Sequence, residues 1–533
     1  AQVIFCMDDR EEGIRRHLEE LNPMIETLGA AGFFGVPINW KGLDDDTITP
    51  LCPVVVTPSH EIRELADTGE EHRQQKHQHR RSLRLALKNL IQQETYRSLF
   101  TPLLITAAAP FGLLALLGKI TGFRLLGQFN DALREHFDIP VQTRITLTAH
   151  NDDQDATPQQ PRMGFTDSEQ ADRVQIFLRN TGLTQGFAPF VVFMGHGSMS
   201  QNNPHLSAYD CGACSGNHGG PNARIFAQIA NRTEIRDILR QRGIDIPDDT
   251  CFLGLEHNTC DESLYWYDTE QVPEPLLDSF AQLKQELFLA AQKSAHERCR
   301  RLASAPRRPS LKTALNHVAG RGYDFSQARP ELGHATNAAA FIGRRSMSQG
   351  AFFDRRVFLI SYDPTQDDEE GHILETLLLA NGPVGAGINL EYYFSTVNNE
   401  QYGSGSKITH NVTGLFAVMD GASSDLRTGL PLQMIEIHEA MRLQVVVEAS
   451  TDLLTQIYMR QPPLQELVGN GWLLLSAKDP DSGAISIFIP GKGFVPWQGQ
   501  VTQLPEVDTS SDWYDGHHLP LNPALIKQEE VHA

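Results

Sequence analysis

The chain opens with AQVIFCMDDREEGIRRHLEEL (residues 1–21), in which one predicted element passes directly into another. Residues 2–7 form a short apolar run typical of a buried strand, and the charged stretch after it carries Ile14, Leu18 and Leu21 at helical spacing. This pattern predicts a strand, a turn and a helix. Further short apolar runs, punctuated by glycine and proline, alternate with helix-like segments, which favours an α/β fold with a parallel sheet.

The same patterns divide the chain into regions. Residues 174–178 and 190–194 are predicted to be strands, and residues 221–243 a helix that begins at Pro221. We expect a parallel sheet core in residues 1–81 and 138–262, an apolar helical insertion in 82–137, a helical connecting region in 263–349 and a second α/β region in 350–533.

Composition limits the classes of protein to which the chain can belong. Its 533 residues are 40% hydrophobic and 21% charged, as in globular proteins that fold in water. The net charge of −21 repels phosphate backbones, so we expect no nucleic-acid partner. Seven thinly spread cysteines are not a disulfide framework and leave thiols free to hold metal. Because the chain passes from its first residues into a buried strand, we expect an N-terminal portion to be missing.

One part of the insertion is unusually apolar. Ser98–Gly118 carries no charge between Arg97 and Lys119, and its length approaches the roughly 20 residues that a transmembrane helix requires. Pro102 and Pro110 interrupt it. Three interpretations remain open: a buried helical hairpin, a docking surface for a membrane partner, and a true span or re-entrant segment.

A first group of reactive side chains follows the first strand. Cys6, Asp8 and Arg10 form the pattern Cys-x-Asp-x-Arg where the strand ends and the helix begins. In open α/β sheets this edge binds ligands, and an arginine can hold a carboxylate through two hydrogen bonds. The alternative is a cysteine at a strand end, followed by an ordinary charged helix start.

A second group lies in PFVVFMGHGSMSQNNPHLSAYDCGACSG (189–216). His196 lies just past a strongly apolar strand, and Cys211 opens a glycine-rich turn. Together with Cys6 they provide two thiolates and an imidazole, which is the ligand set of a zinc site with one position left for water or substrate. The sequence therefore predicts a zinc site at the carboxyl ends of the strands.

Several rival interpretations use the same residues or their neighbours. Cys214 forms a CxxC pair with Cys211, which is typical of a redox pair or a structural zinc site. The thiols and the histidine can also simply be packed at strand ends without metal. The other competing ligands are His205, His218, His257 and Cys260.

The two motifs together resemble known families. Cys-x-Asp-x-Arg after one strand, followed by VVFMGHG…CGAC, is similar to the β-carbonic anhydrases, in which the second pair is His-x-x-Cys. The longer separation of His196 and Cys211, and the segment EYYFSTVNNEQYGSGSKITHNVTGLFAVMDGASSDLRTGLPLQMIEIHEAMRL (391–443), resemble instead the probable inorganic-carbon transporter subunits DabA. The likeness extends over essentially the whole chain and matches the C-terminal two thirds of that family.

The resemblance implies a zinc protein with a β-carbonic-anhydrase-like core, whose ligands fall on Cys6, Asp8, His196 and Cys211, with Arg10 as the partner of Asp8. It also implies a multispan membrane partner of the DabB type, similar to proton-pumping NADH dehydrogenase and antiporter subunits. The pair would hydrate CO2 to bicarbonate in one direction, driven by a cation gradient. The chain would lie peripherally on the cytoplasmic face of the cell inner membrane. A zinc-dependent hydrolase and a non-catalytic zinc scaffold of a membrane complex are the alternatives.

Asp8 has two predicted roles. If Arg10 holds its carboxylate, the fourth zinc position is free for water, whose pKa the metal lowers toward about 7. If Asp8 binds the zinc itself, the site is closed and inactive. A carboxylate that changes between these two partners would act as a gate.

Weaker signals come from the C-terminal region. Two glycine-rich loops, Ser404–Lys407 and Gly421–Arg427, could hold an anion, although neither has a known phosphate-binding pattern. His410, Glu436 and His438 are candidate proton-relay groups. We favour the interpretation that these loops and residues serve in packing and turn formation.

Overall fold

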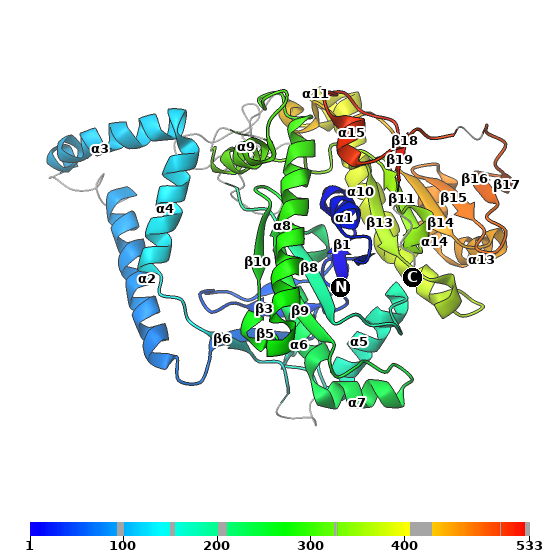
Figure 1. Ribbon diagram of the computed structural model, residues 1–533, viewed down its shortest axis with the longest axis horizontal. Helices are drawn as coiled ribbons and strands as arrows, with labels where there is room; N and C mark the ends of the chain where they lie inside the picture. The colour runs from blue at the N-terminus through cyan, green and yellow to red at the C-terminus, as the bar shows by residue number, and fades with distance from the viewer. Residues whose placement is uncertain are drawn as a thin grey trace.

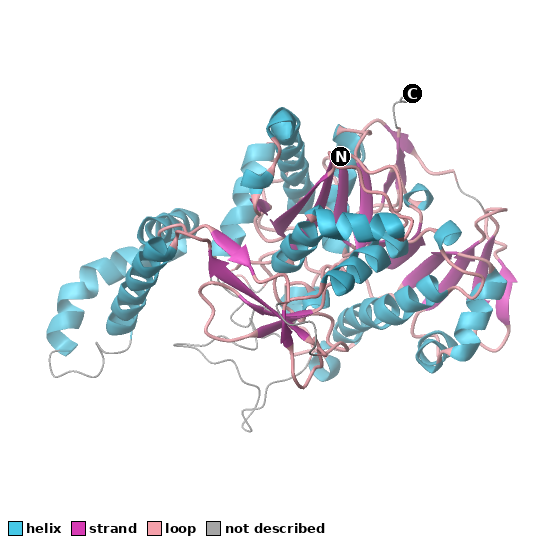
Figure 2. Cartoon of the chain, turned by 90° about the horizontal axis from the view of Figure 1, so that it is seen from below, coloured by secondary structure: helices cyan, strands magenta, loops and turns pink. Residues whose placement is uncertain are grey.

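The computed structural model describes residues 1–92, 101–149, 155–200, 210–324, 327, 329–405, 429–500 and 503–527. Within them, strands and helices form an α/β body, and three helices form an arm that projects from one side (Figure 1, Figure 2). The predicted α/β class is confirmed.

The first sheet places the two predicted ligand-bearing strands side by side. Its strands are β1 (Gln2–Cys6), β2 (Glu26–Ala30), β8 (Phe190–Gly197), β9 (Cys251–Asn258) and β10 (Ser263–Trp266). They run in the order β10-β9-β8-β1-β2, and all are parallel except the edge strand β10. Because parallel strands end at the same edge of a sheet, Cys6 and His196 lie at one rim.

Helices cover both faces of this sheet, as a parallel sheet requires. One face packs on α1 (Asp9–Leu21) and α8 (Leu277–Cys299), and its core includes Phe5 and Leu287. The opposite face packs on α5, α6 and α7 through residues such as Phe193. The bounds of these three helices are α5 (Asp167–Thr181), α6 (Gly220–Asn231) and α7 (Thr233–Gln241).

Two local predictions were wrong in this region. Residues 174–178 belong to the helix α5, because Ala171, Val174 and Leu178 recur at helical spacing and face the core. The helix predicted at 221–243 is broken at Arg232, whose extended backbone separates α6 from α7.

A smaller sheet flanks the core. Its strands run in the order β4-β3-β5-β6, and β7 pairs with β5. Their bounds are β3 (Ile38–Lys41), β4 (Thr49–Leu51), β5 (His60–Ala66), β6 (Thr143–Ile145) and β7 (Arg162–Met163).

The second α/β region packs against the first sheet near the predicted site. The backbone N–H of Leu359 donates to the carbonyl of Met7 at 2.9 Å, so the turn after β1 is held against the second region. This region begins before residue 350, because β11 already belongs to its sheet. The strands of that sheet are β11 (Ala339–Gly343), β13 (Val357–Ser361), β14 (Gln444–Glu448), β15 (Leu474–Lys478), β16 (Ile485–Ile489) and β17 (Gly493–Pro496). Its helices are α10 (His372–Val397), α11 (Asn399–Tyr402), α12 (Leu432–Ile435), α13 (Thr451–Arg460) and α14 (Pro462–Gly469).

Short elements near the C-terminus complete the body. A third sheet has the order β12-β19-β18 and packs with α15. The bounds are β12 (Ala351–Phe352), β18 (Glu506–Val507), β19 (Ala524–Ile526) and α15 (Ser510–Tyr514).

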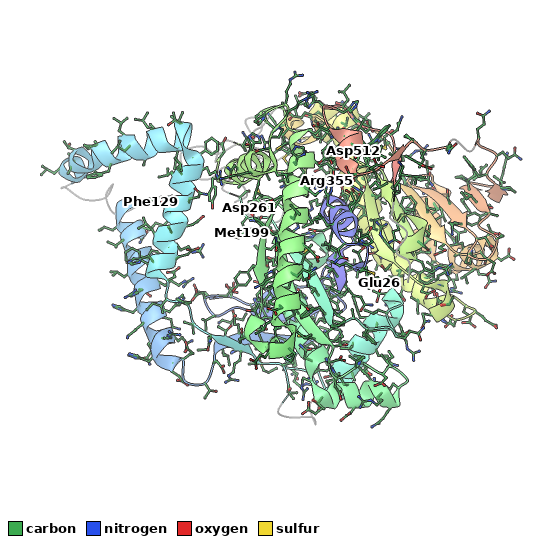
Figure 3. All side chains as sticks on the ribbon, in the orientation of Figure 1. Glu26, Phe129, Met199, Asp261, Arg355 and Asp512 are labelled. Carbon is green, nitrogen blue, oxygen red and sulfur yellow. The ribbon has the colours of Figure 1, made fainter. Side chains whose placement is uncertain are left out.

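The arm consists of α2 (Glu71–Gln92), α3 (Thr101–Thr121) and α4 (Phe123–Phe137). It joins the body where α4 contacts α9 (Leu311–Tyr323) (Figure 1). Its apolar side chains face outward. Phe111 and Leu114 of α3 are 74% and 66% exposed, and Phe129 of α4, labelled in Figure 3, is 59% exposed.

These exposures contradict the buried-hairpin interpretation of Ser98–Gly118, whose residues 98–100 lie outside the described part. Among the described helices, α10 alone is long and apolar enough to cross a membrane, and 33% of its most apolar window is buried in the protein. The described apolar stretch of the arm, Ile105–Thr121, is shorter than that limit.

Candidate metal centre

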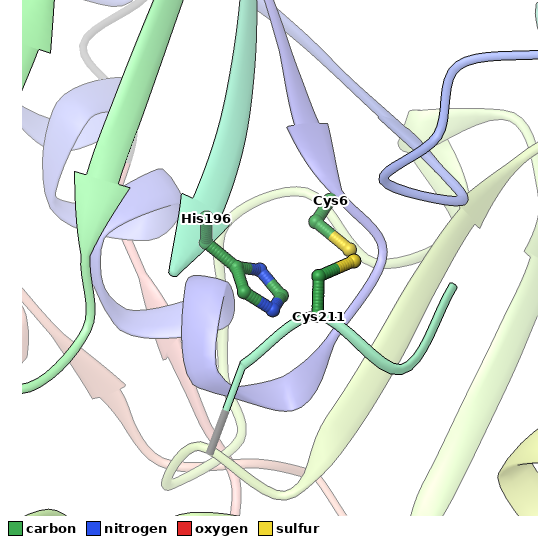
Figure 4. A group of neighbouring side chains, drawn as sticks. All are labelled: Cys6, His196 and Cys211. Atoms are coloured by element: carbon green, nitrogen blue, oxygen red, sulfur yellow. The ribbon is translucent and has the colours of Figure 1, made fainter. Parts of the chain in front are cut away.

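Three predicted ligands converge at the rim of the first sheet. Cys6 ends β1, His196 lies near the end of β8, and Cys211 precedes a short 3₁₀ turn, Gly212–Cys214. Their ligand atoms all lie within 4.8 Å of one another, and all three side chains are buried (Figure 4). In a tetrahedral zinc site these atoms would be about 3.4–3.8 Å apart, so small movements would suffice to bind the ion.

The backbone beside the two sulfurs leaves them room. A Cβ atom added to Gly32 would lie 2.6 Å from the Sγ of Cys211 and 3.1 Å from the Sγ of Cys6. Only glycine therefore fits here without displacing the thiols. The space that a side chain would fill, together with the donor set of two sulfurs and one imidazole, fits a zinc ion.

We expect Gly32→Ala to weaken zinc binding about 10–100-fold, the range found when the support of metal ligands is disturbed. The added methyl group would push the sulfurs of Cys6 and Cys211 out of position. Zinc titration against a competing chelator measures the effect. Gly212→Ala is the matched control, because a Cβ there meets nothing within 4 Å. Wild-type affinity in Gly32→Ala would show that the sulfurs do not need this space.

The pKa values of both thiols are raised. Hydrogen bonding to Cys211, together with burial, raises the pKa of the Cys6 thiol well above its usual value. Hydrogen bonding to Cys214 likewise raises the pKa of Cys211 well above its usual value. Such thiols keep their protons until a metal cation displaces them, so metal binding here would release protons.

Asp8 is held by Arg10. The Oδ1 atom of Asp8 accepts from the backbone N–H of Arg10 at 2.8 Å and from its Nε at 3.1 Å, while Oδ2 accepts from Nη2 at 2.9 Å. Burial acts to raise the pKa of Asp8, but Arg10, together with His334 and His196, outweighs it and holds that pKa well below its usual range. Asp8 is therefore an anion paired with Arg10, and its Oδ2 lies 3.8 Å from the Nε2 of His196.

Arg10 also approaches His196 directly. Its Nη2 lies 2.9 Å from the Nε2 of His196 and donates to the carbonyl of Asp210 at 3.2 Å. A metal bound through Nε2 would require this guanidinium nitrogen to move away. The structure thus groups Cys6, His196 and Cys211, and places Asp8 and Arg10 immediately beside them as a pair.

Acidic and histidine side chains that sequence analysis missed surround this pair. The Nδ1 of His334 lies 2.5 Å from Asp9 Oδ1 and 3.6 Å from Asp8 Oδ1, and Glu331 Oε1 lies 3.5 Å from Arg10 Nη1. Burial raises the pKa of Asp9 to about 6. Glu331 and His334 come from the loop before β11, so the segment that leads into the second region contributes to the centre. The only sequence signal was several charged residues close together in that loop.

The rival ligands have other partners. His218 Nδ1 contacts Glu256 Oε1 at 2.6 Å beside a cavity of about 450 Å³, and His257 lies between two glutamates. Cys214 is buried beside Cys211, and Cys260 lies against Gly322 of α9. None of them joins the three-ligand group within the described residues, and His205 lies outside those residues.

The C-terminal candidates do not reach this centre in the described part. Glu436 pairs with Arg329, and Nδ1 of His438 lies 3.2 Å from the Oγ1 of Thr396. Burial lowers the pKa of His438 to about 4. His410, the loop 421–427 and residues 406–407 of the other glycine-rich loop lie outside the described residues.

Comparison with known proteins assigns the family. Residues 1–473 match the family model described as "Probable inorganic carbon transporter subunit DabA". The chain belongs to the DabA family. It is 60% identical over 527 residues to a probable inorganic carbon transporter subunit DabA of Methylococcus capsulatus, and 57% identical over 529 residues to that of Dechloromonas aromatica. A DabA of Geobacillus thermodenitrificans is 39% identical over 490 residues.

Family membership confirms the resemblance to DabA that was predicted from the long separation of His196 and Cys211 and from the segment 391–443. The alignments cover 99%, 99% and 91% of this chain but 49%, 52% and 55% of the three relatives. The chain therefore spans about half the length of these DabA proteins, a smaller share than the two thirds that the resemblance predicts.

Proposed function

We propose that this chain is the zinc-binding part of an energy-coupled inorganic-carbon transporter and that it hydrates CO2 to bicarbonate together with a membrane subunit. The observation that carries the proposal is the convergence of Cys6, His196 and Cys211 beside the Asp8–Arg10 pair. Two thiolates and an imidazole leave one position of a tetrahedral zinc site open, as in catalytic rather than structural sites.

A bound zinc ion would supply a positive charge that lowers the pKa of water toward about 7. The protein's own groups would orient the reactants. Asp8, kept ionised by Arg10, offers an acceptor for a proton of water near His196 Nε2. The Asp8 carboxylate would have to give up at least part of its three hydrogen bonds to Arg10 in order to bind the metal. Movement of Asp8 from Arg10 toward the ligands would therefore close the centre.

The coupling to a membrane partner follows from the direction of the reaction. A free anhydrase would let accumulated bicarbonate return to CO2, so a concentrating system must keep the centre closed until energy is supplied. The partner that we propose is a multispan DabB-like subunit, similar to proton-pumping NADH dehydrogenase and antiporter subunits. The chain would lie on the cytoplasmic face of the inner membrane, where the arm offers apolar side chains for contact.

Exchange of 18O from labelled CO2 tests this function. Membranes that hold both subunits are expected to catalyse the exchange, and the isolated chain to be nearly inactive. Esterase activity without exchange would favour a zinc-dependent hydrolase. Zinc binding with neither activity would favour a non-catalytic scaffold, and full exchange by the isolated chain would refute the gating.

A separate prediction concerns the role of the arm in membrane association. Leu114→Asp, or Leu117→Lys in the same helix, is expected to move most of the protein from the membrane fraction to the soluble fraction while zinc content stays unchanged. Both side chains are exposed, and their helix α3 lies in the arm that projects from the body (Figure 1). Val55→Asp is the control, since Val55 is 90% exposed but lies in a loop of the body. If the Leu114→Asp protein is insoluble and loses its zinc, the arm has a structural role instead.

A further inference from the structure

The two ring nitrogens of His196 have different neighbours. His196 is fully buried, and its Nδ1 has no hydrogen-bond partner among the described residues. The carboxylate oxygen Oε1 of Glu11 lies 3.5 Å from this nitrogen, whereas Nε2 lies on the side of Arg10 and Asp8. A buried N–H without an acceptor is costly, so a small closing movement of Glu11 would be favourable.

Glu11 is itself fixed by a second histidine. Both of its carboxylate oxygens contact the Nδ1 of His257, at 2.9 and 3.0 Å. His257 lies on β9 directly beside His196 of β8, because the two are register partners. Its other ring nitrogen, Nε2, contacts Oε2 of Glu262 at 2.8 Å. A histidine held at both nitrogens keeps the Glu11 carboxylate in one place.

His196, Glu11, His257 and Glu262 form a row of side chains, and its far end contacts α8. The Oε1 atom of Glu262 accepts from the Oγ of Ser294 at 2.8 Å and lies 3.0 Å from Nη2 of Arg298. All members of the row are buried. Buried charged groups persist when each has a partner, and this row ends at a helix that packs on α1, which carries Glu11.

We propose that Glu11 and His257 are positioning residues of the metal centre. Glu11 accepts the N–H of His196 Nδ1 and so leaves the Nε2 lone pair for a metal ion, while His257 holds the Glu11 carboxylate against that ring. Metal-binding histidines commonly have such a carboxylate partner, which fixes the tautomer and the ring orientation. This inference rests on the metal centre of the proposed function.

Zinc affinity, measured against a chromophoric chelator, tests the proposal directly on the purified chain. Glu11→Ala is expected to weaken zinc binding about 10–100-fold. Glu11→Gln should weaken it less, because the amide oxygen still accepts the same N–H, and His257→Gln should also weaken it. Cobalt substitution gives a second readout, since its visible absorption reports the ligand geometry and should change in Glu11→Ala.

Glu256→Gln is the matched control. Glu256 is adjacent to His257 on β9 and also bonds a histidine, His218, but it does not contact His196. The Glu256→Gln protein should bind zinc with wild-type affinity. Wild-type affinity and an unchanged cobalt spectrum in Glu11→Ala would overturn the proposal, and so would an equal loss in Glu256→Gln. If Glu11→Ala does not fold, Glu11→Gln and His257→Gln decide the question by the same measurements.

Failure of the proposed function can be distinguished from failure of the positioning role. A wild-type chain that binds zinc but supports no CO2 hydration would refute that function, while the affinities of the Glu11 variants would still test the positioning role. A wild-type chain that binds no zinc would overturn both.

Discussion

Cys6→Ala and Cys211→Ala are each expected to reduce zinc from stoichiometric to near zero. Each substitution removes one of the two sulfur atoms that lie within 4.8 Å of a ring nitrogen of His196. Zinc held by several protein ligands is bound by roughly 10–16 kcal/mol in small zinc domains, and that free energy falls steeply when a thiolate is lost. Elemental analysis of the purified proteins measures the effect.

Cys214→Ala is the control for these variants. Cys214 is as deeply buried as Cys211 and follows it in the CxxC pair, but it does not belong to the three-ligand group. The Cys214→Ala protein should therefore retain zinc. Loss of zinc only in Cys214→Ala and Cys260→Ala would contradict the assignment and indicate a structural site. Thermal unfolding of each variant separates ligand loss from general destabilisation.

Arg10→Ala is expected to abolish CO2 hydration and to lower the free energy of unfolding by about 3–5 kcal/mol, the usual cost of breaking a buried ion pair. The substitution removes the positive charge that pairs with Asp8 and that also lies near Glu331. The freed Asp8 carboxylate, whose Oδ2 is 3.8 Å from His196 Nε2, would then be available to bind the metal and close the centre. Exchange of 18O, zinc content and chemical denaturation measure the three effects.

Arg16→Lys provides a matched control for an Arg10→Lys variant. Arg16 is equally buried in α1 and donates to both carboxylate oxygens of Glu297 at 2.9 Å, but it lies away from the centre. Both lysine variants should lose stability, and only Arg10→Lys should lose exchange activity. An Arg10→Ala protein that hydrates CO2 at the wild-type rate would contradict the role of the pair.

Local sequence patterns were sufficient to predict the part of the fold that positions the centre. The apolar run at 2–7 and the helical spacing of Ile14 and Leu18 correspond to β1 and α1, because both elements bury the side chains that the pattern shows. The meeting of Cys6 and His196 followed from the common edge of parallel strands. These predictions needed no knowledge of distant contacts.

Other features depend on contacts that sequence patterns do not show. Val174–Leu178 is apolar enough for a strand, but its tertiary partners select a helix. Glu11 has the sequence appearance of an ordinary acidic residue in a first helical turn, and only the fold brings His257 to it. The apolar run in the arm is equally consistent with burial and exposure, and the described part shows exposure.

X-ray absorption at the zinc edge of the purified wild-type chain identifies the atoms around the metal and so tests the predicted zinc ligands themselves. We expect stoichiometric zinc with two sulfur ligands at about 2.3 Å and the remaining nitrogen or oxygen ligands at about 2.0–2.2 Å. A shell of four sulfurs, or a chain that holds no zinc, would contradict this expectation.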